Sequence, residues 1–317
     1  MCGFSHNTVP EHTPYRKRIP CCPWYEACYR ADMPRRRPRL PRLTGQGYLS
    51  RLILPPHLRE TAAAMPINDA GHGIDVFGMS RAGAYRGLAM TYWLYEHYFR
   101  VESHNTENVP ASGRAVLACN HSGMLPLDAM MVAHDLMRNR KRPARVAMDY
   151  FVPGLPWVNL VLTRSGGFSG TRGNFHALLE ADELLLVFPE GVPGIGKPFS
   201  KRYQLQDWRQ GHAELAIRHA TPVVPMCVIG AEEQWPQLAR IEGVEKLGLP
   251  YLPVPATPLP LPVKYHIWYG EPIPIPALYT PEQANDAAAV TEAAERIKAA
   301  VAGLIAHGLQ QRRGIFR

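Results

Sequence analysis

Short apolar runs that alternate with helical stretches fill residues 101–317, and this alternation constrains the fold more than any other feature. Glu183–Phe188 (ELLLVF) is the clearest strand, and further strands are predicted at Ala115–Cys119, Ala144–Met148, Val223–Ile229 and Val263–Tyr269. Helices are predicted at Asp128–Asn139, Asn174–Ala181, Trp208–His219 and Thr280–His307. This order predicts an α/β domain with a mixed, largely parallel sheet flanked by helices.

Three further segments differ from this pattern. Residues 84–100 are predicted to be a helix with a bulky aromatic face, which would either pack against the core or lie at a membrane interface. Residues 45–70 are mixed in composition and are expected to be irregular or briefly helical. The proline-rich segment 250–262 is expected to hold no regular element and to form an extended loop.

The charge of the chain is unevenly distributed. Residues 1–44 hold nine basic and three acidic residues, and thus most of the net charge of +8. They also contain Cys2, Cys21, Cys22 and Cys28, whose spacing does not match a zinc knuckle. We expect a flexible basic tail at 1–44, a helical segment at 45–100 that is a candidate for membrane association, and the main domain at 101–317. Because the body is nearly neutral, nucleic acid is not an expected partner.

The first candidate site follows the predicted strand Ala115–Cys119. His121 lies in the turn after this strand, and Asp128 opens the next predicted helix. In open α/β sheets, sites form in the loops at the carboxyl ends of strands. A carboxylate that holds one imidazole nitrogen leaves the other free to act as a base. The alternative is that His121 is a loop histidine and Asp128 a helix cap.

The second candidate site follows the strand ELLLVF. Phe188-Pro189-Glu190-Gly191 places a carboxylate directly after an apolar strand, so Glu190 is expected at the sheet edge beside the loop of His121. By itself this tetrapeptide is also typical of a simple surface turn. Residues 191–197 match the spacing of a phosphate-binding P-loop, but Pro198 stands where that motif needs Ser or Thr. A nucleotide triphosphatase is therefore not expected.

Together, Asn120-His121…Asp128, then Phe188-Pro189-Glu190-Gly191, then Thr221-Pro222-Val223-Val224-Pro225, resemble the motifs of the glycerolipid acyltransferase family. This family includes 1-acylglycerol-3-phosphate and other lysophospholipid acyltransferases. The resemblance implies transfer of a fatty acyl chain from acyl-CoA or acyl-carrier protein to a lipid hydroxyl, with no covalent acyl-enzyme. It implies no cofactor and no metal, and it implies a cytoplasmic protein that is peripheral on the membrane surface.

The resemblance also implies roles for single residues. His121 would be the general base and Asp128 its orienting partner. Glu190 and Gly191 would contribute to acceptor binding. Gly166-Gly167-Phe168 falls where a further motif of the family lies, and Arg164 or Arg172 beside it would hold phosphate of the acceptor or donor. The arginine that usually follows the Phe-Pro-Glu-Gly motif of the family is missing here, and Lys197, Lys201 or Arg202 are candidates to supply its charge.

The spacing of the first block also departs from the family pattern, because six residues rather than four separate His121 from Asp128. This form resembles a bacterial branch of the family, and two residues, including Pro126, must loop out to preserve the dyad. Two alternatives to a lysophospholipid acyltransferase remain: an enzyme that acylates diacylglycerol or another neutral lipid, and a non-catalytic peripheral lipid-binding protein.

Overall fold

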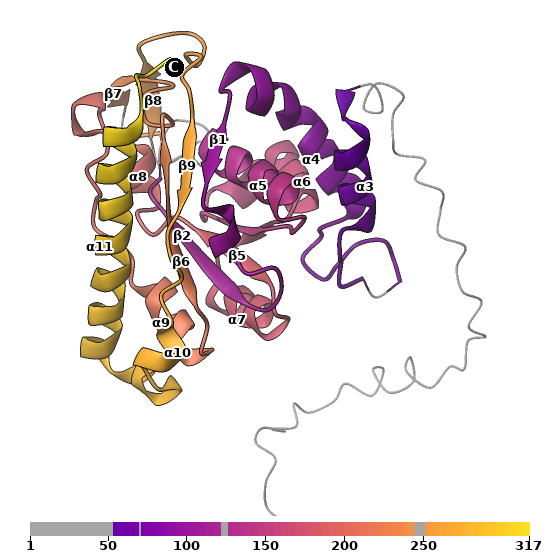
Figure 1. The fold of residues 1–317 in the computed structure, drawn as a ribbon, viewed down its shortest axis with the longest axis vertical. Helices are drawn as coiled ribbons and strands as arrows, with labels where there is room; N and C mark the ends of the chain where they lie inside the picture. The colour runs from indigo at the N-terminus through magenta and orange to yellow at the C-terminus, as the bar shows by residue number, and fades with distance from the viewer. Residues whose placement is uncertain (1–52, 70, 122–125, 242, 245–250) are drawn as a thin grey trace, which may run out of the picture. The chain divides into compact units, whose positions relative to one another are not determined.

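The predicted strand Ala115–Cys119 forms β2, in the middle of a seven-stranded sheet (Figure 1). The computed structural model describes residues 53–69, 71–121, 126–241, 243–244 and 251–317. The sheet order is β1-β9-β6-β2-β5-β3-β4. Its other strands are β1 (Glu102–His104), β3 (Arg145–Met148), β4 (Gly167–Ser169), β5 (Leu184–Val187), β6 (Val223–Ile229) and β9 (His266–Tyr269). Among the described strands of this sheet, β6 and β9 pair antiparallel and all other neighbours pair parallel, which confirms a mixed, largely parallel sheet.

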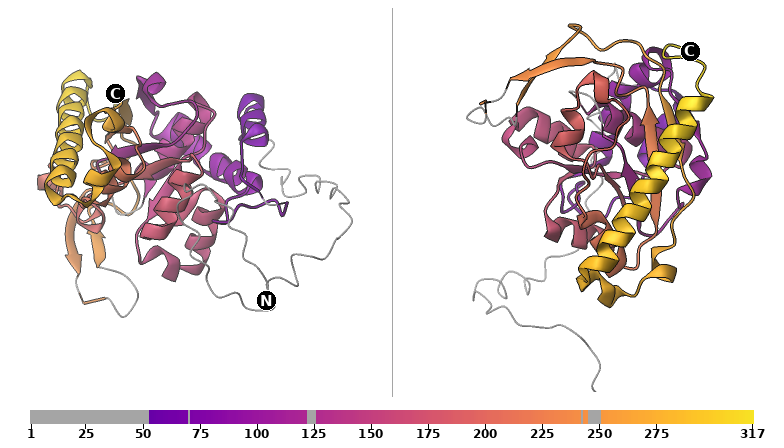
Figure 2. Two further views of the ribbon diagram at one scale, coloured as in Figure 1. Left: turned by 90° about the horizontal axis from the view of Figure 1, so that it is seen from below. Right: turned by 90° about the vertical axis from the view of Figure 1, so that its left-hand side faces the viewer.

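Helices cover both faces of this sheet. Leu117 and its alternate neighbours in β2 pack against α5 (Leu127–Asn139). Val116 and Ala118 face the opposite side and share a core with α7 (Arg172–Glu180), α9 (Gly211–Arg218) and α11 (Ala287–Gln311). Figure 2 shows α11 lying across the strands. Burial on both faces explains why these strands are continuous apolar runs rather than alternating ones.

The N-terminal helices form a layer with α5. α3 (Pro56–Ala64), α4 (Arg81–Trp93) and α6 (Pro156–Arg164) contact one another or α5, with α4 central to the group (Figure 1). α4 continues as a π-helical turn over Leu94–Tyr98. Tyr95 and Phe99 are buried, so the predicted helix over 84–100 packs against the core on its inner face, whereas Trp93 is 56% exposed.

The expectation that 250–262 holds no regular element is wrong at one place. Leu252–Pro255 forms β8, which pairs antiparallel with β7 (Gln237–Ile241) in a ribbon that extends from the body of the fold (Figure 2). Proline removes a backbone donor, but β8 has a strand on one side only, so its prolines need not interrupt a ladder on the other. The prolines led to the prediction of a loop, because the sequence alone does not show that β8 lies at an edge.

Several boundaries and elements were also not predicted. α9 begins at Gly211 rather than at residue 208, and α11 follows a 3₁₀ turn at Pro281–Asn285. The edge strands β1 and β4, the helix α6, and the four-residue helices α8 (Val192–Ile195) and α10 (Ile275–Leu278) went unrecognised. The predicted tail at 1–44 lies outside the described residues. Among the described helices, none combines the length and apolar character required to cross a bilayer.

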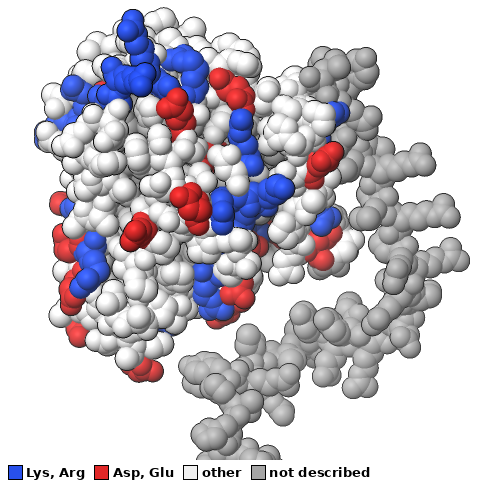
Figure 3. All heavy atoms as spheres, in the orientation of Figure 1, with Lys and Arg blue, Asp and Glu red and all other residues white. Residues whose placement is uncertain are grey.

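Charges of both signs are interspersed over the face drawn in Figure 3, among a larger uncharged surface. This distribution follows from the sequence, because most of the net positive charge belongs to residues 1–44. A surface of this kind does not by itself select a strongly charged macromolecular partner.

Candidate active site

His121 and Asp128 form a buried pair at the carboxyl end of β2. The Nδ1 atom of His121 lies 2.8 Å from Oδ2 of Asp128, and Asp128 is fully buried in the first turn of α5. The second carboxylate oxygen of Asp128 accepts a hydrogen bond from the backbone N–H of Ala129, at 2.7 Å. The six-residue spacing therefore permits the dyad, although Ser122–Leu125 lie outside the described residues.

This pairing sets the chemistry of the imidazole. When the Asp128 carboxylate accepts a hydrogen bond from Nδ1–H, the tautomer leaves Nε2 as the basic ring nitrogen. The ring of His121 also stacks on Phe188, with centroids 4.2 Å apart, which limits its rotation. The side chain is therefore held in one orientation, as a general base requires.

Glu190 lies beside this dyad, as the sequence predicts. β2 and β5 are parallel neighbours, with Ala118 opposite Val187, so the residues that follow each strand emerge together. Glu190 accepts hydrogen bonds from the backbone N–H of His121, at 3.0 Å, and of Gln206, at 2.9 Å. The carboxylate thus fixes the backbone of His121.

Gly191 and Gly194 allow the following loop to pack closely on the dyad. Gly191 has φ +56°, and a Cβ there would lie 3.1 Å from Cζ of Arg209. A Cβ on Gly194 would lie 2.7 Å from Cβ of Glu190 and 3.1 Å from Cβ of His121. Larger residues would displace the histidine or its supporting carboxylate.

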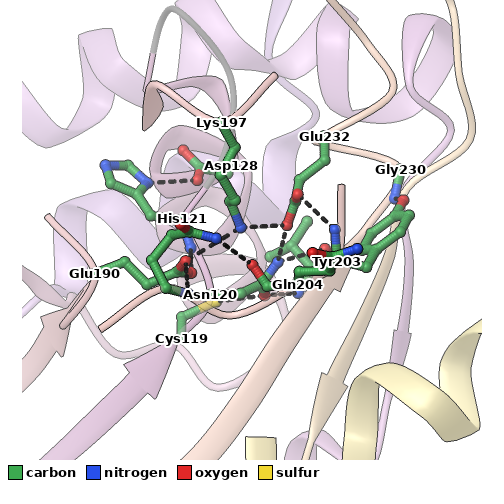
Figure 4. A network of polar contacts seen from close by, with 12 residues as sticks. Cys119, Asn120, His121, Asp128, Glu190, Lys197, Tyr203, Gln204, Gly230 and Glu232 are labelled. Carbon is green, nitrogen blue, oxygen red and sulfur yellow. Dashed lines mark hydrogen bonds and ion pairs between the residues drawn. The ribbon is translucent and has the colours of Figure 1, made fainter. Parts of the chain in front are cut away.

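Lys197 and Glu232 extend this support into a buried network (Figure 4). The Lys197 ammonium lies 3.2 Å from Glu190 and 3.1 Å from Glu232, and all three side chains are almost fully buried. Glu232 also accepts hydrogen bonds from the Asn120 side chain, at 3.2 Å, and from the Tyr203 N–H, at 2.7 Å. Burial raises the pKa of Glu232, against the attraction of the Lys197 ammonium.

An apolar cavity of about 360 Å³ adjoins the dyad. His121 and Phe188 line it at the sheet edge, and Tyr251 and Pro253 line it from the β8 ribbon. Most of the remaining lining is apolar, and part of it comes from α4, α5 and α6, with Leu88, Met90, Met130, Met137, Val158, Val161 and Leu162. A cavity with this lining suits a hydrocarbon chain better than a polar ligand.

The three predicted arginines are placed apart from the dyad. Arg164 donates to the Gly78 carbonyl, at 3.2 Å, and the exposed Arg172 pairs with Glu214, at 2.7 Å. Arg202 lies over the ring of Phe199. Of the predicted site residues, the structure brings together His121, Asp128, Glu190, Gly191 and Lys197. Lys197 forms ion pairs with two buried carboxylates, so its charge is compensated within the interior of the site.

Two residues of the site escaped sequence reasoning. Glu232 follows β6, a parallel neighbour of β2, and the same rule that located Glu190 would have found it. Arg209 places its guanidinium against Gly191, 3.6 Å from the Asp149 carboxylate, which lines the cavity. No motif indicated Arg209, because it reaches the Phe-Pro-Glu-Gly turn only through folding.

The imidazole of such a His–Asp pair can take a proton from a hydroxyl, and the adjoining apolar cavity suits a hydrocarbon chain. Residues 100–229 match the family model described as Acyltransferase. The fold resembles the crystal structure of PlsC, the 1-acyl-sn-glycerophosphate (LPA) acyltransferase of Thermotoga maritima, with a TM-score of 0.50 and 15% identity. That likeness, which covers 74% of this chain and 83% of PlsC, concerns the fold.

Sequence relatives extend the comparison. An uncharacterized protein of Mycobacterium tuberculosis is 35% identical over 237 residues, or 71% of this chain and 66% of the relative. The human "DGAT1/2-independent enzyme synthesizing storage lipids" is 28% identical over 64% of this chain and 60% of its own length. The matches thus span less than two thirds of these relatives. The family match therefore assigns an acyltransferase domain to residues 100–229.

Proposed function

We propose that this protein transfers a fatty acyl chain from an acyl-CoA or acyl-carrier-protein thioester to the hydroxyl of a lysophospholipid or another glycerolipid. The observation that carries the proposal is the His121–Asp128 pair at the wall of the apolar cavity. The acyltransferase match over residues 100–229 supports the same reaction class. The cavity would hold the hydrocarbon chain while the imidazole acts at its reactive end.

The proposed reaction has two proton transfers, both at Nε2 of His121. The acceptor oxygen attacks the thioester carbonyl carbon while Nε2 takes the hydroxyl proton, and Asp128 stabilises the imidazolium through Nδ1–H. The tetrahedral intermediate then expels the thiolate, which receives the proton from Nε2. The C–O ester bond replaces the C–S bond, and no protein nucleophile is needed. General-base help of this kind contributes about 10²–10⁴ in rate.

The position of Arg209 favours an acceptor that carries a phosphate group. Its side chain is 64% exposed and lies at the Gly191 turn, while its partner Asp149 lines the cavity. A guanidinium there would contact the phosphate group of an acceptor whose glycerol hydroxyl is directed at His121. A neutral acceptor such as diacylglycerol is the second candidate, favoured by the largely aliphatic lining and by relatives named for storage-lipid synthesis.

Exposed apolar side chains support peripheral binding to a membrane. On α6, Trp157 is 81% exposed and Leu160 48%, and the neighbouring helix α4 exposes Met90 and Trp93. Met90 also lines the cavity, so this surface adjoins the cavity. Tryptophan favours the headgroup boundary of a bilayer. We call the exposed apolar residues of α4 and α6 the apolar rim: Met90, Trp93, Trp157, Val158, Leu160 and Val161.

The test is acyl transfer from radiolabelled palmitoyl-CoA, and from palmitoyl-carrier protein, to lysophosphatidic acid, other lysophospholipids, monoacylglycerol and diacylglycerol. His121→Ala and Asp128→Asn are assayed in parallel. We expect labelled ester with at least one acceptor and a loss of about 10²-fold or more in His121→Ala. The absence of product from every donor and acceptor, with folded protein, would favour a non-catalytic lipid-binding role instead.

A further inference from the structure

Two histidines and a glutamate meet at the far edge of the sheet, in strands that the acyl-transfer site does not use. Glu102 and His104 are alternate residues of β1, and His266 is the register partner of Glu102 in β9. The three side chains therefore project from one face of two adjacent strands. One ligand-type atom from each lies within 4.8 Å of the others.

The spacing of these atoms matches a tetrahedral metal site. Nε2 of His104 lies 3.3 Å from Nδ1 of His266, and Nδ1 of His266 lies 3.5 Å from Oε2 of Glu102. Bonds of about 2.0–2.2 Å to zinc place tetrahedral ligand atoms roughly 3.3–3.5 Å apart. The Glu102 side chain is 51% exposed, so it can adjust to complete the third contact.

We propose that Glu102, His104 and His266 bind a divalent transition metal of the zinc class. Two imidazoles and one carboxylate are ligands that zinc accepts readily, with solvent in the fourth position. The second oxygen of Glu102 is 2.5 Å from the Lys264 ammonium, a contact that orients the carboxylate. The bound ion would link the three-residue edge strand β1 to β9. This structural role is independent of acyl transfer.

The surroundings of the site supply a local reporter and a matched control. The ring of His104 stacks on Trp268, with centroids 3.8 Å apart, so a bound paramagnetic ion would quench the fluorescence of this tryptophan. His307, on α11, also contacts this indole, with ring centroids 4.8 Å apart, and is exposed, but it is not part of the ligand cluster. His307→Ala therefore changes a histidine near the reporter without removing a proposed ligand.

The experiment uses the full chain with Cys2, Cys21, Cys22 and Cys28 replaced by serine, so that thiolates of the N-terminal segment do not compete. Zn²⁺ is titrated by calorimetry, and Ni²⁺ by quenching of tryptophan fluorescence. We expect one site in this parent protein and in His307→Ala. In His104→Ala the affinity should fall by more than the roughly 10–100-fold that loss of an outer-shell partner costs.

Glu102→Gln keeps a group that can accept from Lys264 but removes the carboxylate charge, and it should also weaken binding. Circular dichroism verifies that each variant is folded, and zinc should raise the Tm of the parent protein but not of His104→Ala. Equal Zn²⁺ affinity in the parent and in the His104→Ala/Glu102→Gln double variant would overturn the proposal. So would a loss in His307→Ala as large as that in His104→Ala.

Discussion

At the scale of single residues, buried charges hold His121, the proposed general base, in position. Glu190 contacts the backbone of His121, and Lys197 lies between Glu190 and Glu232. The attraction within such a group offsets the cost of removing it from water only while every partner is present. The network is therefore sensitive to the loss of any single member.

Lys197→Met should strongly destabilise the fold, because it leaves two buried carboxylates without their shared cation. We expect the free energy of unfolding to fall by about 3–5 kcal/mol, measured by urea denaturation. Lys201→Met is the matched control, since Lys201 is exposed and its replacement should cost less than about 0.5 kcal/mol. Similar losses in the two variants would contradict a special role for Lys197.

Arg209→Ala should separate charged from neutral acceptors. If the guanidinium contacts a phosphate, KM for lysophosphatidic acid should rise about tenfold, as expected for one lost charge-assisted hydrogen bond. KM for diacylglycerol in the same variant should stay unchanged and serves as the internal control. Equal effects on both acceptors would indicate that Arg209 positions the Gly191 turn instead of recognising phosphate.

At the scale of elements, the apolar rim lies on α4 and α6. The spacing of apolar residues along the chain could not distinguish such exposed side chains from those that pack in the core. The inner face of the segment 81–99 packs into the core, while Trp93 and Met90 remain exposed. The same residue types thus serve two environments on one helix. Membrane binding should depend on the exposed set.

Trp157→Ser combined with Leu160→Ser should reduce flotation with liposomes, because both side chains are exposed and apolar. Loss of two such side chains removes about 3 kcal/mol or more of membrane burial, or roughly a hundredfold in partitioning. Leu259→Ser is the control, as Leu259 is 70% exposed but lies outside the rim. Unchanged flotation of the double variant would instead assign membrane contact to another part of the chain.

At the scale of the whole molecule, buried histidines link stability to pH. His134 on α5 stacks on Tyr95, and Nδ1 lies 2.7 Å from the Thr91 hydroxyl. Burial lowers the pKa of His134 to about 4. Between the unfolded pKa of about 6.5 and this value, the unfolded chain binds a proton that the folded chain does not. Stability contributed by the neutral imidazole is therefore lost as the pH falls through this window.

His134→Gln should flatten the dependence of stability on pH. At pH 5 the wild-type protein should lose up to about 2 kcal/mol through His134, relative to its free energy of unfolding at pH 7.5. The glutamine variant cannot bind this proton and should lose less by that amount, whatever its stability at pH 7.5. Urea unfolding of both proteins at the two pH values measures the difference. Parallel losses would show that His134 is not the group responsible.

The sequence by itself determined the central strands, their largely parallel arrangement and the residues of the candidate site. β2 and β6 lie at their predicted bounds, because strands buried on both faces must be apolar throughout. His121, Asp128 and Glu190 were also recognisable, since each directly follows a strand or opens a helix at the sheet edge where sites form. Local signals sufficed for these features because each depends on residues adjacent in the chain.

Only the tertiary structure decided the rest. The edge strands and β8 depend on partners distant in sequence, which supply the hydrogen bonds that three or four residues cannot form alone. The pairing of Lys197 with Glu190 and Glu232, the approach of Arg209 to Gly191, and the meeting of Glu102 with His266 all join separate segments. Such contacts are set by how the elements pack, and no local pattern encodes them.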